Sequence, residues 1–95
     1  MATRPDITIK PNQDNDLIAL LNEQAGFSTV SAGTVLVVQN KSDNFAYVQE
    51  SNQPTVNFTS GKELQRSWQY ETNANAPGVR VTCGGTECVV GVEVL

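Results

Sequence analysis

Cys83 and Cys88 are the residues whose type and spacing most directly suggest chemistry, because only Gly-Gly-Thr-Glu separates them. A type II′ turn centred on Gly85 and Thr86 would make the two cysteines a non-hydrogen-bonded pair in a hairpin, close enough for a disulfide. Two buried free thiols on one strand face are the alternative for a chain made in a cytoplasm. Structural zinc would need about four ligands, and the sequence has no histidine and no further cysteine. We therefore expect no metal here.

The acidic residues before the first apolar stretch superficially have the spacing of a calcium loop, Asn12-x-Asp14-x-Asp16. The sixth position of such a loop would be Leu17 instead of glycine, and the twelfth, Glu23, would lie within the expected helix. Capping of that helix is the favoured interpretation.

Arg66, Trp68 and Tyr70 alternate along an expected strand and would share one face with Leu64. An exposed aromatic face can stack on a sugar ring, so these three residues form a candidate ligand or partner surface. Core packing of the strand is the favoured interpretation, with Arg66 as the exception to explain.

The composition excludes several classes of function. Because histidine is absent, His-based triads and Cys-His dyads are ruled out, and no glycine-rich phosphate loop occurs. We predict a chain that is not an enzyme, with no catalytic residue and no cofactor. Six Lys and Arg against ten Asp and Glu give a net charge of −4, which argues against nucleic acid or an anionic membrane as partner.

The beginning of the chain has no apolar run long enough for a signal peptide, and no later run approaches the ~20 residues of a membrane span. We expect synthesis in a cytoplasm without a signal peptide and no membrane contact. Residues 1–11 are expected to form an extended arm or edge strand, because Pro5 and Pro11 bracket the alternating segment.

Residues 12–95 are expected to form a single β-rich domain, with one short helix near residues 15–25. An apolar stripe that includes Leu17 and Leu21 indicates the helix, Asp14 or Asn15 could cap it, and Gly26 stands where a C-cap glycine belongs.

After residue 30 the pattern becomes that of short strands joined by polar turns. Residues 34–39 and 45–49 are expected to pair as a hairpin, as are residues 79–83 and 88–95. In the second hairpin Val81 would face Val90, and Arg80 would share the outer face with Glu93. About six or seven such strands predict a mainly β fold, an antiparallel β-sandwich or a jelly-roll-like barrel.

Two stretches carry a family resemblance: residues 32–42, Ala-Gly-Thr-Val-Leu-Val-Val-Gln-Asn-Lys-Ser, and residues 46–55, Ala-Tyr-Val-Gln-Glu-Ser-Asn-Gln-Pro-Thr. Over these residues the chain resembles small virion proteins of tailed bacteriophages and prophages. The sequence departs from that pattern at Cys83 and Cys88, where apolar and small residues are usual.

The resemblance implies a non-enzymatic structural protein of a virion, either a capsid decoration or a tail or connector accessory, whose partners are other virion proteins. A small module that binds carbohydrate or a host receptor is the alternative. We further expect a homo-oligomer, with a trimer favoured because capsid and fibre sites offer threefold symmetry. The expected contact residues are the apolar side chains of the arm and helix: Ile7, Ile9, Leu17 and Leu21.

Overall fold

The computed structural model describes residues 4–55 and 57–95. These residues form two antiparallel sheets. The first sheet has the order β1-β8-β3-β6 and the second the order β2-β7-β4-β5. In chain order the elements are β1 (Ile7–Ile9), β2 (Asn15–Asp16), α1 (Leu17–Asn22), β3 (Leu36–Asn40), β4 (Ala46–Gln49), β5 (Lys62–Leu64), β6 (Gln69–Glu71), β7 (Arg80–Cys83) and β8 (Cys88–Val94).

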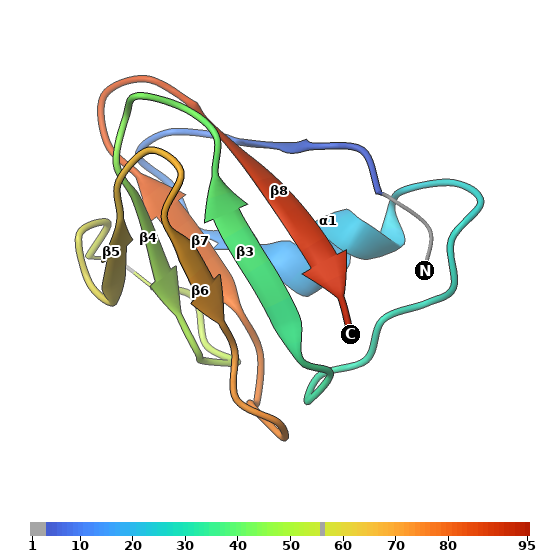
Figure 1. The fold of residues 1–95 in the computed structure, drawn as a ribbon. Coiled ribbons are helices and arrows are strands. Elements are labelled where there is room, and N and C mark those ends of the chain that lie inside the picture. Colours follow the sequence, from blue (N-terminus) through green and yellow to red (C-terminus); the bar gives the residue numbers. More distant parts are fainter. Residues whose placement is uncertain (1–3, 56) are drawn as a thin grey trace.

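The chain repeatedly crosses from one sheet to the other (Figure 1). The pairs β1 and β2, β3 and β4, β5 and β6, and β7 and β8 each divide between the two sheets, whereas β4 and β5 follow one another within one sheet. Two four-stranded sheets connected in this order are a jelly roll. The expected mainly β fold with one short helix is therefore confirmed, and of the two expected architectures the two separate sheets agree with the antiparallel β-sandwich.

Both expected hairpins are wrong. β3 pairs with β6 and β8, so it does not pair with β4. β7 pairs with β2 and β4, so that Cys83 lies opposite Ala46, while Cys88 lies opposite Ile9 on β1. The reason is that a short polar loop can join strands within one sheet or across two sheets, and alternation alone does not distinguish them.

The valines of β7 and β8 face each other across the interior instead of along one sheet. Val81 and Val90 are both fully buried, one from each sheet. Arg80 and Glu93 are consequently on different sheets, opposite Asp16 and Val37 respectively, and the expected surface pair between them does not form.

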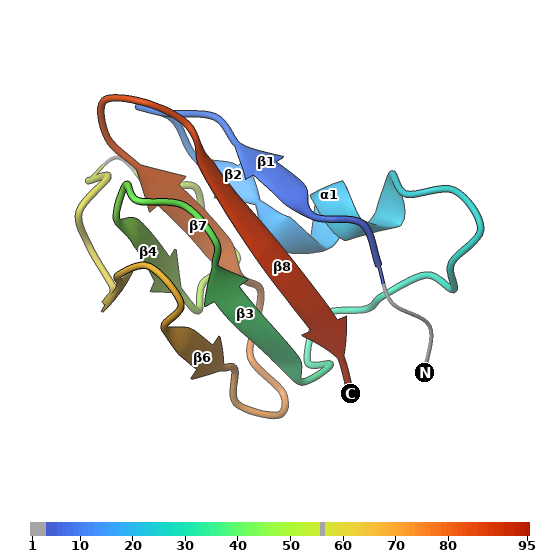
Figure 2. The ribbon, with the colours of Figure 1, turned by 45° about the horizontal axis from the view of Figure 1, so that its top comes forward.

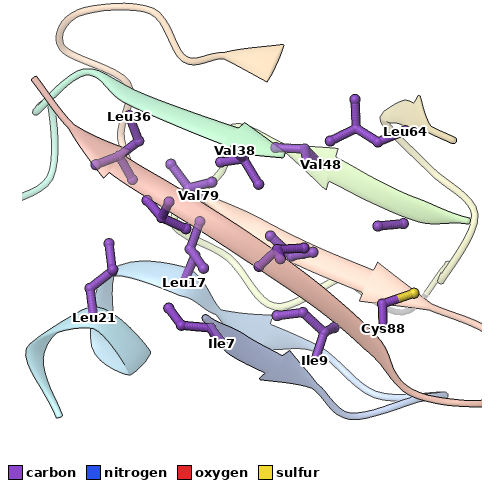
Figure 3. Close-up of a cluster of buried hydrophobic side chains, with 14 of the residues drawn as sticks. Ile7, Ile9, Leu17, Leu21, Leu36, Val38, Val48, Leu64, Val79 and Cys88 are labelled. Carbon is purple, nitrogen blue, oxygen red and sulfur yellow. The ribbon is translucent and has the colours of Figure 1, made fainter. Parts of the chain in front are cut away.

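The core lies between the sheets, where every second strand residue points inward (Figure 3). The larger fully buried aliphatic side chains are Ile9, Leu17, Leu21, Leu36, Leu64, Val38, Val79, Val81 and Val90. Figure 3 shows α1 and β1 contributing to the same cluster as the strands.

The expected arm is an edge strand of the first sheet, lying beside β8 (Figure 2). Of the expected oligomer contacts, Ile9, Leu17 and Leu21 have no exposed surface and Ile7 is 6% exposed. That contact surface is therefore wrong, because the same apolar side chains fill the core of the single chain. Residues 1–3 lie outside the described residues.

α1 is shorter than expected. It begins after Asp16, whose side chain accepts a hydrogen bond from the Ala19 amide, so the cap is neither Asp14 nor Asn15. The helix ends at Asn22, whose side chain bonds both backbone groups of Val30. Gly26 has a φ of +85° in the turn beyond. With six residues, this helix of the described chain is too short to cross a membrane.

Candidate binding surface

Four connections between the sheets meet at one end of the sandwich, which we call the crossing-loop end: residues 10–14, 41–45, 65–68 and 84–87. Figures 1 and 2 both show these connections together, at the upper left. An ion pair joins two of them, since Arg66 Nη1 lies 2.7 Å from Asp43 Oδ1. Both side chains are largely exposed, so the pair contributes little to stability.

Asn40, at the end of β3, holds the 41–45 connection from inside. Its side chain is fully buried, and Nδ2 donates to the carbonyl oxygens of Asn44 and Leu64, at 2.8 Å each. Oδ1 accepts from the amide and the hydroxyl of Ser42, at 3.0 and 2.8 Å. Every hydrogen-bonding group of the carboxamide is therefore used, which fixes the loop in one conformation.

The backbone of Asn40 holds the 65–68 connection in the same way. Its amide donates to the Trp68 carbonyl at 3.1 Å, and its carbonyl accepts from the Ser67 amide at 2.7 Å. Ser67 has a φ of +72°, in the left-handed region, and the Trp68 amide donates to the Gln65 carbonyl within this turn. One buried residue thus positions two of the four loops.

Two further asparagines brace the other loops. Asn44 Nδ2 donates to the carbonyl oxygens of Gly84 and Thr86, at 2.7 and 2.6 Å, and so links the 41–45 and 84–87 connections. Asn15, which is 6% exposed, donates to the carbonyl oxygens of Lys10, Gln13 and Val81. Carboxamides suit this task because one Nδ2 reaches two or more carbonyl groups.

Two exposed aromatic side chains, Phe45 and Trp68, belong to the loops that these hydrogen bonds hold in place. Phe45 is 40% and Trp68 47% exposed, and both belong to the crossing-loop end. Beside Phe45 lies an open hollow of about 320 Å³. Its lining residues are Asp43, Asn44, Phe45, Tyr47, Thr59 and Gly84.

The three candidate surface residues do not share one face. The turn at Ser67 interrupts the expected strand, so Leu64 is buried at the end of β5 while Trp68 projects from the loop. Core packing is therefore wrong for Trp68. Arg66 is exposed and pairs with Asp43, whereas Tyr70 is half-buried on β6 and packs against the core.

Tyr70 belongs to a separate hydrogen-bonded cluster around Glu50. The Tyr70 hydroxyl donates to Glu50 Oε2 at 2.6 Å, and Asn73 donates to the same carboxylate from its amide and from Nδ2. Burial alone would raise the pKa of Glu50, but the hydrogen bonds from Tyr70 and Asn73 outweigh it and lower that pKa. The hydrogen bond to Glu50, followed by burial, raises the pKa of Tyr70.

Because of this cluster, we expect the free energy of unfolding to decrease as the pH falls and Glu50 is protonated. Because the pKa of Glu50 is lower in the folded chain than in the unfolded one, its contribution is complete above the ordinary value of 4.5 and is lost as the folded carboxylate is protonated. We expect Glu50→Gln to unfold at lower urea than the parent at pH 7, with the difference shrinking at pH 3. Glu71→Gln, at an exposed position on β6, is the control. A difference that is equal at both pH values would contradict this assignment.

Cys83 and Cys88 come from opposite sheets and meet in the core at the base of the 84–87 connection, so they do not share a strand face as expected. Both are free thiols in this structure. Cys83 Sγ lies 3.4 Å from the Thr86 carbonyl, and Cys88 Sγ lies 3.4 Å from that of Phe45. Burial, followed by hydrogen bonding to Cys88, raises the pKa of the Cys83 thiol.

The cysteines are therefore expected to be unreactive in the folded protein. We expect carbamidomethylation by iodoacetamide at pH 8 to be more than about tenfold slower in the native chain than in urea, because the thiolate is the nucleophile and both sulfurs are buried. Mass spectrometry counts the modified thiols at each time. Labelling of either cysteine at the same rate with and without urea would refute the prediction.

Asp14 and Asp16, the acidic residues of the calcium-like spacing, form ion pairs with the guanidinium of Arg80. Arg80 Nη1 lies 3.0 Å from Asp14 Oδ2 and 3.6 Å from Asp16 Oδ2, and only 11% of its side chain is exposed. Within residues 4–55 and 57–95 no group of three or more metal-binding side chains occurs. Asp14 and Asp16 thus act in an ion pair and in capping.

Sequence reasoning missed the residues that build the crossing-loop end. The pattern places Asn40 and Asn44 in a polar turn and Phe45 at the start of a strand. The available signal is asparagine directly after a strand, which marks a turn but does not reveal burial. Comparison of the chain with protein-family models, with curated proteins and with solved structures finds no match.

Proposed function

We propose that this chain is a non-enzymatic structural component of a tailed-phage virion, a capsid decoration or a tail or connector accessory, that acts through protein contacts. The virion role rests on the resemblance of residues 32–55, which include β3, β4 and the connection between them. Jelly rolls are common in viral capsid proteins, which agrees with the proposal at the level of fold alone.

The crossing-loop end is the observation that supports binding through protein contacts. Phe45 and Trp68 are exposed on loops that buried carboxamides hold in place. A surface that is already ordered loses little conformational entropy on binding, and aromatic side chains are frequent anchors of interfaces.

Mass spectrometry of purified particles from cells that carry the gene tests the virion role. We expect the chain in the particles, and we expect Phe45→Ala with Trp68→Ala to reduce its incorporation while leaving its circular dichroism spectrum unchanged. Leu95→Ala is the matched control, since Leu95 is also exposed but lies at the far end of β8 (Figure 1). Absence of the chain from particles would refute the proposal.

Carbohydrate or host-receptor binding is the second candidate, because the exposed Trp68 could stack on a sugar ring. Tyr70 adds little to such a platform, because its side chain is half-buried and packs against the core. A glycan array distinguishes the two candidates. Specific sugar binding that Trp68→Ala abolishes, with the chain missing from particles, would favour this second function.

We also propose that the chain forms a homo-oligomer, with a trimer favoured. The contact must involve other side chains than the apolar ones of β1 and α1, since these are buried. Light scattering over a concentration series measures the assembly. A monomer at the highest concentration would refute it.

A further inference from the structure

The hollow beside Phe45 combines aromatic side chains with hydrogen-bond acceptors. Phe45 and Tyr47 supply the aromatic part of the lining, and Asp43 supplies a carboxylate whose side chain is 86% exposed. Among the described residues that line the hollow there is no lysine or arginine. With a volume of about 320 Å³, the hollow is at the small end of ligand sites, a size suited to a single side chain or ring.

Two residues of the lining, Asn44 and Thr59, already use their side-chain donors within the chain. Both Nδ2 hydrogens of Asn44 go to the carbonyl groups of Gly84 and Thr86. The Thr59 hydroxyl donates to Asn57 Oδ1 at 3.0 Å. The side-chain atoms that remain for a ligand are two hydrogen-bond acceptors, Asp43 Oδ2 and Asn44 Oδ1. A sugar hydroxyl both donates and accepts, whereas lysine and arginine only donate.

Tyr47 keeps its proton in this setting. Burial, followed by the charge and hydrogen bonding of its cross-strand neighbour Glu63, raises the pKa of Tyr47. Glu63 adds a second carboxylate next to the aromatic wall. Aromatic faces together with carboxylates attract a cation and disfavour an anion.

We propose that this hollow binds a lysine or arginine side chain of a partner protein, with the cation against Phe45 and Tyr47 and its N–H groups donating to Asp43. The proposal rests on the proposed protein-contact function and names the chemistry of that contact. The net charge of −4 makes the chain as a whole complementary to a basic partner segment.

Arg66 already occupies one oxygen of the same carboxylate. Its Nη1 lies 2.7 Å from Asp43 Oδ1, and the Arg66 side chain is 66% exposed. An exposed pair of this kind is weak, so an incoming guanidinium can displace it. Arg66 therefore acts as a competitor built into the site, and its removal should strengthen binding.

The test is a titration of the ¹⁵N-labelled protein with N-acetyl-arginine amide, followed by NMR. N-acetyl-citrulline amide, which has nearly the same shape but no charge, is the control ligand. We expect saturable shifts of the amides of residues 43–47, 59 and 84 with the arginine compound and none with citrulline. Added salt should weaken the effect because the charges are exposed.

Three variants sharpen the test. Asp43→Asn and Phe45→Ala should each weaken binding about two- to fivefold, in keeping with an exposed charge pair and a cation–π contact. Arg66→Gln should strengthen it by a similar factor. Glu71→Gln is the matched control and should change nothing, because Glu71 is exposed and lies at the end of β6 that points away from the crossing-loop end. Asp14 would not serve as a control, since it forms an ion pair with Arg80.

The outcomes separate this proposal from the virion role. Equal shifts with citrulline, no shifts with arginine, or a preference for monosaccharides at the same amides would each overturn the cation site. The chain could still be found in particles in those cases. Conversely, charge-dependent binding at the hollow together with absence from particles would refute the virion role and leave the site intact.

Discussion

Replacing Arg80 with methionine is expected to lower the free energy of unfolding by about 3 kcal/mol, because it leaves carboxylates without their partner at a mostly buried position. Arg80 pairs with Asp14 at 3.0 Å, and its other nitrogens donate to the carbonyl oxygens of Ser51 and Asn52. It thereby links β7 to the segment before α1 and to the connection between β4 and β5. Urea unfolding measures the loss.

Arg66→Met is the matched control, since it makes the same change in an exposed ion pair, and it should cost less than about 1 kcal/mol. Should Arg80→Met fail to fold, Arg80→Lys supplies a graded measurement, because lysine cannot reach the carboxylate and both carbonyl groups at once. Equal losses for Arg66→Met and Arg80→Met would show that Arg80 is not a structural link.

Asn40→Asp is expected to be comparably damaging, at about 3 to 5 kcal/mol near neutral pH, because a buried carboxylate would face two carbonyl oxygens in place of a donor. Those oxygens, of Asn44 and Leu64, lie 2.8 Å from Nδ2. Protonation of the new side chain removes the charge and restores one donor, so the defect should shrink as the pH falls. Unfolding at pH 7 and pH 4 measures both effects.

Asn52→Asp is the control for this substitution, because Asn52 is exposed. Its side-chain oxygen accepts a hydrogen bond from Gln53 Nε2 at 3.4 Å, and an aspartate oxygen can accept the same bond. Asn52→Asp should cost less than about 0.5 kcal/mol. In Asn40→Asp the amide signals of the 41–45 and 65–68 connections should also shift. Unchanged signals there would contradict the role of Asn40 in positioning the loops.

The strands themselves were largely predictable from the sequence. Alternation identifies which side chains are buried, as with Leu36 and Val38 on β3 and with Val90 and Val92 on β8. It does so because a strand residue has only two faces to choose between. The prolines on both sides of residues 6–10 likewise indicate an edge position, which β1 occupies.

Strand partners were not predictable in the same way. Val81 and Val90 would be buried in a hairpin and are buried across the sandwich, so the same pattern fits both arrangements. The choice depends on how all strands fill one core, which is a property of the whole chain. For the same reason the sequence pattern could not show whether Ile7 and Ile9 contact another subunit or the core of their own chain. In the structure they belong to that core.

The candidate surface was predictable only in part. An exposed Trp68 is one of the two alternatives that the pattern allows, and the sequence holds no feature that marks Ser67 as the left-handed residue breaking the strand. The role of Asn40 depends on carbonyl groups contributed by residues four and 24 positions away. Such a network exists only after the loops have met.

The position of β8 between β1 and β3 has a consequence for how the chain folds. Ile7 pairs with Val90 and Leu36 with Val94, so the middle of the first sheet is made of segments far apart in the sequence. Closing such distant pairs costs chain entropy before any contact offsets it, which slows folding. On the ribosome, a chain made only as far as residue 87 would hold two unpaired strand edges and a core open on one side. The chain is therefore expected to wait for residues 88–94 and then to fold in one cooperative step.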